Sequence, residues 1–195
     1  MSLQKAEHGV KFHAQKIQGM FLIEPEVFSD ERGVFRRHYC EREFAAHGIS
    51  ALIRQCNVSE NKRRYTLRGF HYQLPPHSEG KTVSCLKGGI YDIVVDLRCS
   101  SSTYLQWVGI ELNESNRLGV HVPPGCASAF LTLDDNCMIN YLSTNFYHPS
   151  AEKSIRYNDS LFGFKWPVEP VVISDKDNGQ PDYLPAQRKS EFELL

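Results

Sequence analysis

The stretch KTVSCLKGGIYDIVVDLR, residues 81–98, sets two runs of apolar and β-branched residues on either side of a glycine pair, Gly88 and Gly89. β-Branched and aromatic side chains favour strands, and adjacent glycines allow the positive φ of a tight turn at little cost. The stretch therefore predicts two β-strands that are joined at the glycine pair.

Similar short runs continue on both sides of this stretch, from about residue 65 to residue 145. They are LRGFHYQ at 67–73, WVGIEL at 107–112, GVHV at 119–122, AFLTL at 129–133 and CMINYLST at 137–144. Turn signals rather than helical segments separate them, which is typical of an antiparallel sandwich or barrel and not of βαβ units. The sequence predicts a mainly β fold with a few short peripheral helices. The clearest early helix is CEREFAAHG at 40–48, where Gly48 is a natural stop.

Length, charge and cysteine pattern narrow the class of protein. A chain of 195 residues predicts one domain, residues 1–195, with a core at about 20–182 and a C-terminal tail at about 183–195. Lysine and arginine number 22 against 23 acidic residues, so no global charge attracts a nucleic acid or an anionic membrane.

No run approaches the roughly 20 apolar residues of a membrane span, and a secretory leader is not evident, so a cytoplasmic protein is expected. The six cysteines form no CxxC pair and are expected to be reduced and mostly buried.

The run LRGFHYQLPP, residues 67–76, holds a titratable histidine within a strand-like segment that two prolines end. Strict alternation would place His71 on one face and Arg68 on the other, unless a bulge intervenes. A single strand histidine is more often structural than catalytic, but Arg68, Lys81 and Arg32 could surround an apolar pocket with positive charge. Asp177, in SDKDNGQPD at 174–182, could orient the imidazole and stabilise its protonated form.

Metal-dependent and nucleotide-hydrolysing chemistry lack the expected motifs. His71 is followed by tyrosine and glutamine, and the next histidine, His77, lies beyond two prolines, so no HxH ligand pair is present. The chain also lacks a GxGxxG strand–helix turn, a Walker loop and a GxSxG elbow. No metal site and no cofactor are expected.

Eight co-linear segments together resemble the dTDP-4-dehydrorhamnose 3,5-epimerase family. They are FSDERGVF, LRGFHYQ, GKTVSCLKGGIYDIVVDLR, SSTYLQWVGIEL, VPPGCASAFLTL, YHPSAE, FKWP and ISDKDN, and they span roughly residues 20–182. The resemblance implies a cupin-like jelly-roll barrel of antiparallel strands and a homodimer with strand exchange across the interface. It also implies a cofactor-free enzyme whose substrate is a nucleotide-diphosphate-linked 4-keto-6-deoxyhexose.

The resemblance further assigns expected roles to individual residues. His71 falls at the position of the family's catalytic base, Asp177 at that of its partner carboxylate and Tyr141 at that of its general acid. Lys81 is our candidate to stabilise the enolate that forms beside the C4 ketone. The expected substrate-binding positions are Arg32, Gln55, Asn57, Arg68, Lys81, Glu152 and Lys176.

Two positions depart from the family pattern and leave alternatives open. Ser128 stands where the family has a histidine, which could accompany epimerisation at only one carbon. Arg37 stands where a glutamate is usual, and arginine donors would suit cytosine better than thymine. The alternatives are therefore a mono-epimerase, acting at C3 or C5 only, on a CDP-linked or other nucleotide sugar, and a catalytically silent nucleotide-sugar binding protein. A metal-dependent cupin would need ligands that this sequence lacks.

Overall fold

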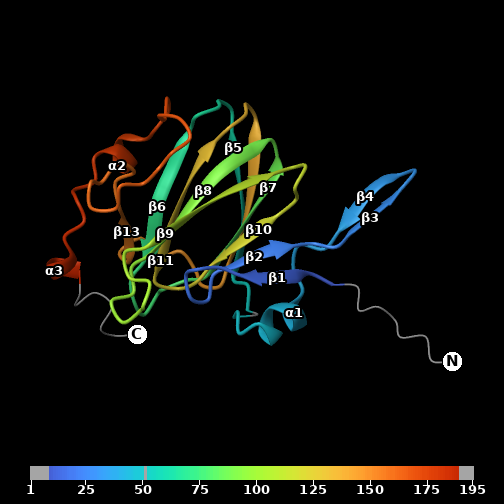
Figure 1. Ribbon diagram of the computed structural model, residues 1–195, viewed down its shortest axis with the longest axis horizontal. Helices are drawn as coiled ribbons and strands as arrows, with labels where there is room; N and C mark the ends of the chain where they lie inside the picture. The colour runs from blue at the N-terminus through green and yellow to red at the C-terminus, as the bar shows by residue number, and fades with distance from the viewer. Residues whose placement is uncertain (1–8, 51, 189–195) are drawn as a thin grey trace.

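Two antiparallel sheets face each other in the computed structural model, which describes residues 9–50 and 52–188 (Figure 1). One sheet has the strand order β1-β2-β10-β7-β12-β5 and the other has β13-β6-β11-β8-β9, while a two-stranded hairpin, β3-β4, projects from this body. The strands are β1 Lys11–Ala14, β2 Phe21–Glu24, β3 Val27–Asp30, β4 Gly33–Arg36, β5 Gln55–Asn61, β6 Leu67–Gln73, β7 Lys81–Lys87, β8 Gly89–Asp96, β9 Trp107–Asn113, β10 Gly119–Val122, β11 Cys126–Thr132, β12 Cys137–Ser143 and β13 Glu152–Ser154. The predicted antiparallel jelly-roll barrel is confirmed.

The helices are few and short, as predicted. They are α1 Glu41–Ala46, α2 Asp175–Asn178 and α3 Pro185–Arg188. α1 lies within the predicted segment 40–48, buries Phe44 and is followed by Gly48 at φ +71°. This glycine conformation ends the helix without the steric cost that a side chain would add.

The glycine turn after β7 changes the sheet to which the chain belongs. Gly88 has φ +72°, and a Cβ atom added there would lie 2.7 Å from the Cys137 sulfur, so the turn requires glycine. The two predicted strands form, but β7 lies in the six-stranded sheet and β8 in the five-stranded sheet. The turn therefore connects the two layers and does not close a hairpin.

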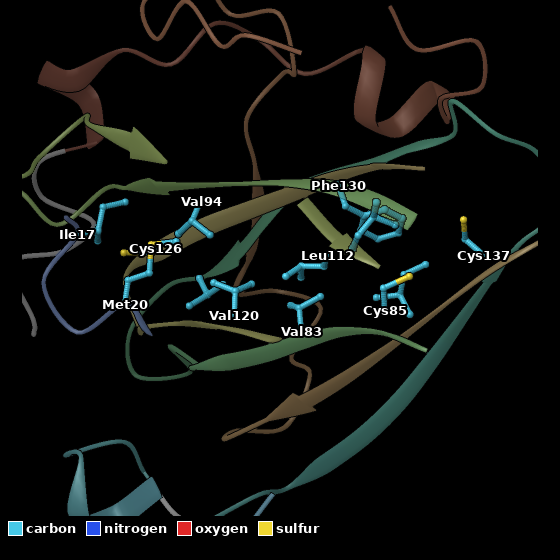
Figure 2. Packing of buried hydrophobic residues seen from close by; sticks show 13 residues of the cluster. Ile17, Met20, Val83, Cys85, Val94, Leu112, Val120, Cys126, Phe130 and Cys137 are labelled. Carbon is cyan, nitrogen blue, oxygen red and sulfur yellow. The ribbon is translucent and has the colours of Figure 1, made fainter. Parts of the chain in front are cut away.

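The main hydrophobic core fills the space between the two layers (Figure 2). Alternate residues of the facing strands supply it, so that each strand contributes one apolar face. The buried members are Ile17, Met20, Val83, Cys85, Ile90, Val94, Leu112, Val120, Val122, Cys126, Phe130, Cys137 and Ile139. All six cysteines lie in the described residues as free thiols, with three buried, two half-buried and Cys56 exposed.

The outer face of the five-stranded sheet is covered by the C-terminal segment. Phe70 of β6 stacks on Phe164, with 4.4 Å between ring centroids, and the indole of Trp107 donates to the Phe162 carbonyl at 3.0 Å. The segment after Pro167 contains the short helices α2 and α3 in its described part, and α3 lies within the predicted tail. Residues 189–195 of the predicted tail lie outside the described residues.

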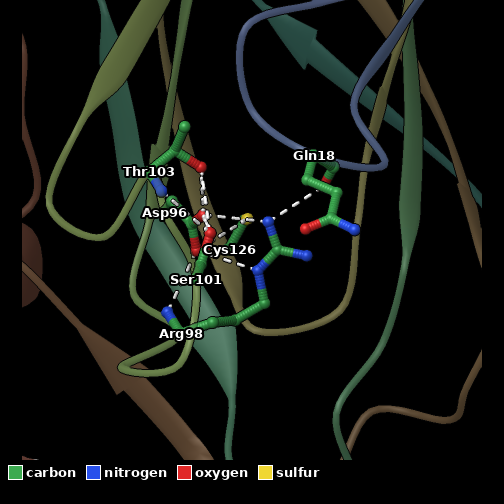
Figure 3. A network of polar contacts seen from close by, with 6 residues as sticks. All are labelled: Gln18, Asp96, Arg98, Ser101, Thr103 and Cys126. Carbon is green, nitrogen blue, oxygen red and sulfur yellow. Dashed lines mark hydrogen bonds and ion pairs between the residues drawn. The ribbon is translucent and has the colours of Figure 1, made fainter.

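A polar network closes the end of β8 (Figure 3). The carboxylate of Asp96 accepts hydrogen bonds from Arg98, Ser101 and Thr103, and Arg98 also donates to the backbone carbonyl of Gln18 at 2.9 Å. Burial would raise the pKa of Asp96, but these hydrogen bonds outweigh burial and hold the pKa below its usual value. The network ties the loop before β2 to the five-stranded sheet.

Candidate active site

A β-bulge in β6 determines the position of His71, the candidate base. His71 pairs with Ser128 of β11 and Arg68 pairs with Phe130, so Gly69 and Phe70 together lie opposite one residue. Gly69 has φ +116°, and an added Cβ atom would lie 2.6 Å from backbone atoms of β11. Strict alternation would separate Arg68 from His71, but the bulge turns both toward the same face of the sheet.

His71 is held by a buried carboxylate. Its Nε2 atom lies 2.8 Å from Oδ1 of Asp177, whose other oxygen accepts the Gly69 N–H at 3.4 Å. Ser174 caps α2 by accepting the Asp177 N–H at 3.1 Å, which fixes the carboxylate. Burial would raise the pKa of Asp177, but hydrogen bonds from His71 and its other donors outweigh that effect and lower it. An ionised Asp177 orients the imidazole and stabilises a proton on it.

Tyr141 and Lys81 belong to the opposite sheet. Val83 of β7 pairs with Tyr141 of β12 and Ser143 pairs with Lys81, so Tyr141 and Lys81 share one face of this sheet. Burial, and next the carboxyl of Asp92, raise the pKa of Tyr141 above its ordinary value. Its phenol therefore keeps its proton at neutral pH and can serve as a donor.

Asp92 lies two positions from each of the core residues Ile90 and Val94 on β8. Residues at this spacing share one face of a strand, so Asp92 also faces the interior between the layers. It is 1% exposed, and its Oδ2 atom has no hydrogen-bond partner among the described residues. Burial raises the pKa of Asp92 well above its usual value, against the effect of the Lys81 charge. Burial thus favours the neutral form of a carboxyl group that lies within electrostatic reach of the lysine and the tyrosine.

The two faces enclose a cavity of about 380 Å³ at the open end of the barrel. Polar and aromatic side chains line it, and they come from both sheets and from the loop after β12. The lining residues are Gln55, Asn57, His71, Tyr72, Gln73, Glu79, Lys81, Tyr141, Ser143, Tyr147 and Glu152. Of the twelve predicted site residues, six line this cavity: His71, Lys81, Tyr141, Gln55, Asn57 and Glu152.

A second polar cluster forms one rim of the cavity. Glu152 accepts hydrogen bonds from Lys176 at 2.6 Å and from the Tyr147 hydroxyl at 2.9 Å. Burial would raise the pKa of Glu152, but Lys176 and Tyr147 outweigh it, so the pKa is lowered. The hydrogen bond with Glu152 in turn raises the pKa of Lys176. The backbone N–H of Tyr147 donates to Gln55 at 2.6 Å, which anchors the loop to β5.

Other predicted residues lie behind or away from the cavity. Asp177 is buried behind His71, and the exposed Arg68 donates to Asn61 at 2.7 Å. Ser128 lies opposite His71 on β11 without lining the cavity. Arg32 sits at the turn of the projecting hairpin and pairs with Asp30.

Arg37 follows the same hairpin, and its guanidinium donates to Glu43 of α1 at 3.1 Å. Within one chain, the structure does not bring Arg32 or Arg37 to the cavity.

Six residues at the site were not predicted from the sequence. Tyr72, Gln73, Glu79, Ser143 and Tyr147 line the cavity, and the buried Asp92 lies within electrostatic reach of Lys81 and Tyr141. The i, i+2 spacing of Glu79 and Lys81 is a signal for a shared face, because alternate residues of an extended segment point the same way. A lone aspartate between apolar strand residues, as at Asp92, was a second signal.

The described residues contain no group of three or more histidine, cysteine, aspartate or glutamate side chains that could hold a metal ion. In the same part of the chain, every helix is too short to cross a bilayer as an apolar span. The side chains that line the cavity offer an imidazole, a phenol, an ammonium group, carboxylates and hydrogen-bonding amides.

Known proteins resemble this chain in both sequence and fold. The family profile described as dTDP-4-dehydrorhamnose 3,5-epimerase matches residues 14–184. A dTDP-4-dehydrorhamnose 3,5-epimerase of Methanothermobacter thermautotrophicus is 39% identical over 170 residues, which are 86% of this chain and 91% of the relative.

Two solved structures illustrate the range of similar proteins. The dTDP-4-dehydrorhamnose 3,5-epimerase of Bacillus anthracis with TDP and PPi bound has a TM-score of 0.86 and 32% identity, over 89% of this chain and 99% of that one. A 3'-monoepimerase of Streptomyces bikiniensis in complex with dTDP-quinovose has a TM-score of 0.82 and 31% identity, over 91% and 89% of the two chains.

Proposed function

Because this chain belongs to the dTDP-4-dehydrorhamnose 3,5-epimerase family, we propose that its cavity binds dTDP-4-keto-6-deoxyglucose and inverts C3 and C5. The chain is an isomerase that acts on a nucleotide-linked sugar. The observation that carries the proposed mechanism is the position of His71 on one sheet, where Asp177 of α2 holds it, across the cavity from Tyr141 and Lys81 on the other sheet.

Proton removal is the role proposed for His71. The C4 ketone acidifies the protons on both neighbouring carbons, so one base can act at C3 and at C5. Asp177 remains ionised and hydrogen-bonded to the imidazole, so it stabilises the imidazolium that forms when His71 accepts a proton. Lys81 would offer its ammonium to the oxygen on C4, where negative charge develops.

Proton return is the role proposed for Tyr141. Inversion requires that a carbon lose its proton on one face and gain a proton on the other. A base and an acid on opposite sheets meet this requirement without movement of either side chain across the substrate. The raised pKa of Tyr141 keeps the phenol protonated until the enolate withdraws its proton.

The nucleotide end of the substrate would lie along the outer part of the cavity. Gln55 and Asn57 provide amide groups, Lys176 and Arg68 provide positive charge, and the half-exposed ring of Tyr147 provides a face on which a base can stack. Relatives bind TDP or a dTDP-sugar. Arg37 is paired with Glu43, so it does not favour a cytosine nucleotide within one chain.

Proton exchange with solvent tests this proposal directly. In D2O, wild-type protein with dTDP-4-keto-6-deoxyglucose is expected to lose the C3 and C5 proton signals in a time course of NMR spectra. Tyr141→Phe is expected to retain exchange at one carbon at least while its yield of inverted product falls by roughly 10²-fold, because only the returning proton is lost. The matched control is Tyr157→Phe, whose side chain lies outside the cavity lining.

The other outcomes of the same experiment separate the alternatives. Exchange at a single carbon would identify a mono-epimerase, which the similarity to the 3'-monoepimerase makes the second candidate. Faster exchange with the CDP-linked sugar would reverse the choice of nucleotide. Binding without exchange of either substrate would indicate a silent binding protein and would exclude the proposed enzyme.

We further propose a homodimer in which the β3-β4 hairpin lies against a second copy. The hairpin projects from the two sheets (Figure 1) and pairs with no other strand in the described part of the chain. It exposes Phe28 and Phe35, the latter at 70%. Two-stranded hairpins are marginal in water, and exposed aromatic residues favour a covered interface. β5 is an edge strand beside the cavity, so a partner hairpin laid along β5 would bring Arg32 to the nucleotide.

Light scattering checks the dimer. Wild-type protein is expected to give twice the 22.3 kDa mass of one chain, and Phe35→Asp is expected to give the single mass. If the hairpin completes the site, the KM for the dTDP-sugar should rise at least about tenfold in this variant. A wild-type monomer with full activity would contradict the shared site.

A further inference from the structure

Glu79 forms a buried ion pair that the proposed mechanism does not use. Its carboxylate lies 2.9 Å from the Lys81 ammonium, and the two side chains are 8% and 20% exposed. Both residues line the cavity. Little solvent reaches the Glu79 carboxylate, so its negative charge acts mainly on Lys81. Lys81 is the group that would meet the enolate oxygen.

The backbone between the two residues is fixed. Gly80 donates its N–H to Oγ1 of Thr144 at 2.8 Å, and its carbonyl accepts the Thr144 N–H at 2.9 Å. The ring of His121 packs against Gly80, where an added Cβ atom would lie 3.1 Å from it. Glu79 and Lys81 therefore extend from a short segment that β12 and β10 hold in place.

Two carboxyl groups lie near the one ammonium, but they differ in charge. Glu79 contacts Lys81 at the cavity wall, whereas Asp92 lies deeper between the sheets, where burial favours its neutral form. A lysine stem is flexible, so the position of its ammonium depends on the counter-ion that holds it. With Glu79 charged, the ammonium is held at the wall; without that charge, the ion pair that fixes it there is lost and the flexible stem can carry the ammonium away from the wall.

We propose that Glu79 is a positioning residue for the epimerisation, which holds the Lys81 ammonium at the cavity wall where charge develops on the C4 oxygen. The inference rests on the proposed function of this cavity. It assigns to Glu79 no contact with the reacting carbons and no proton transfer. Its effect is preorganisation, because an ammonium already in place needs no reorganisation as the enolate forms.

Glu79→Gln tests the inference, because it removes the charge and keeps the shape. Proton exchange at C3 and C5 in D2O is expected to slow by roughly 10- to 100-fold in kcat, with KM within about threefold of wild type. Glu79→Asp keeps the charge and is expected to recover most of the rate.

The controls keep the result specific. Glu114→Gln makes the same chemical change at an exposed turn and is expected to leave kcat and KM unchanged. Wild-type kcat in Glu79→Gln would overturn the inference alone. Equal losses in Glu79→Gln and Glu79→Asp, with equal falls in melting temperature, would also overturn it in favour of a structural role. Failure of wild-type protein to exchange either proton would overturn the proposed function together with this inference.

Discussion

His71→Asn is expected to slow proton exchange at C3 and C5 by about 10³-fold or more, with little change in melting temperature. General base catalysis contributes roughly 10²- to 10⁴-fold, and asparagine cannot accept a proton at neutral pH. The amide can still donate a hydrogen bond to Asp177, so the cavity wall should keep its shape. NMR spectra of the dTDP-linked substrate in D2O measure the exchange, and thermal unfolding checks the fold.

A matched histidine shows whether the effect belongs to the site. His13 of β1 is exposed and pairs with Glu24, so His13→Asn should exchange both protons at the wild-type rate. Exchange by His71→Asn within tenfold of wild type would assign the base to another residue. Exchange at only one of the two carbons would indicate that a second base serves the other.

The second large effect is expected from Gly69→Ala. The backbone at φ +116° disfavours any side chain, and the new Cβ would lie 2.6 Å from Cα of Ala129 and from the Ser128 carbonyl oxygen. Strain and overpacking together should lower the free energy of unfolding by roughly 2–6 kcal/mol. Because Gly69 forms the bulge before His71, the residual folded protein should also lose most of its exchange activity.

Gly163→Ala separates the two causes. Gly163 also has a positive φ, +57°, but no atom lies within 4 Å of the position of an added Cβ. Its replacement should cost only about 1 kcal/mol, from the backbone conformation alone. Urea unfolding of both variants gives the comparison, and equal midpoints would show that the close approach to β11 is not what requires glycine at position 69.

The strands that the sequence predicts well are those with β-branched or aromatic runs. β7, β8, β9, β10 and β12 follow from these runs, because their residues face a core on at least one side. β5 reads QCNVSEN and carries no such pattern, since its inward side chains line a polar cavity and not the apolar core. A strand whose side chains line a polar cavity lacks the apolar, β-branched and aromatic residues by which strands are predicted from sequence.

Contacts between residues of different strands and helices could not be predicted from the local sequence pattern. The bulge at Gly69 depends on how closely β11 approaches, so the sequence left a bulge in β6 open but could not establish that Arg68 and His71 share a face. The contact of His71 with Asp177 joins residues 106 positions apart; side-chain chemistry allowed this pairing, and the resemblance to a family assigned it. The Glu79–Lys81 pair is local, but its burial depends on β12 and β10.

The Gly88 turn affects the ratio of inverted to merely exchanged product through the spacing of the two sheets. Since the turn sends β7 and β8 into different layers, the candidate base and the candidate acid stand on sheets whose separation the apolar core between them maintains. Phe130, whose ring centroid lies 6.3 Å from that of Tyr141, is part of this core. Protein interiors are packed too densely for such a spacer to change size without moving its neighbours. Substitutions in the core could therefore alter the ratio of inversion to simple exchange while every residue that touches the sugar stays the same.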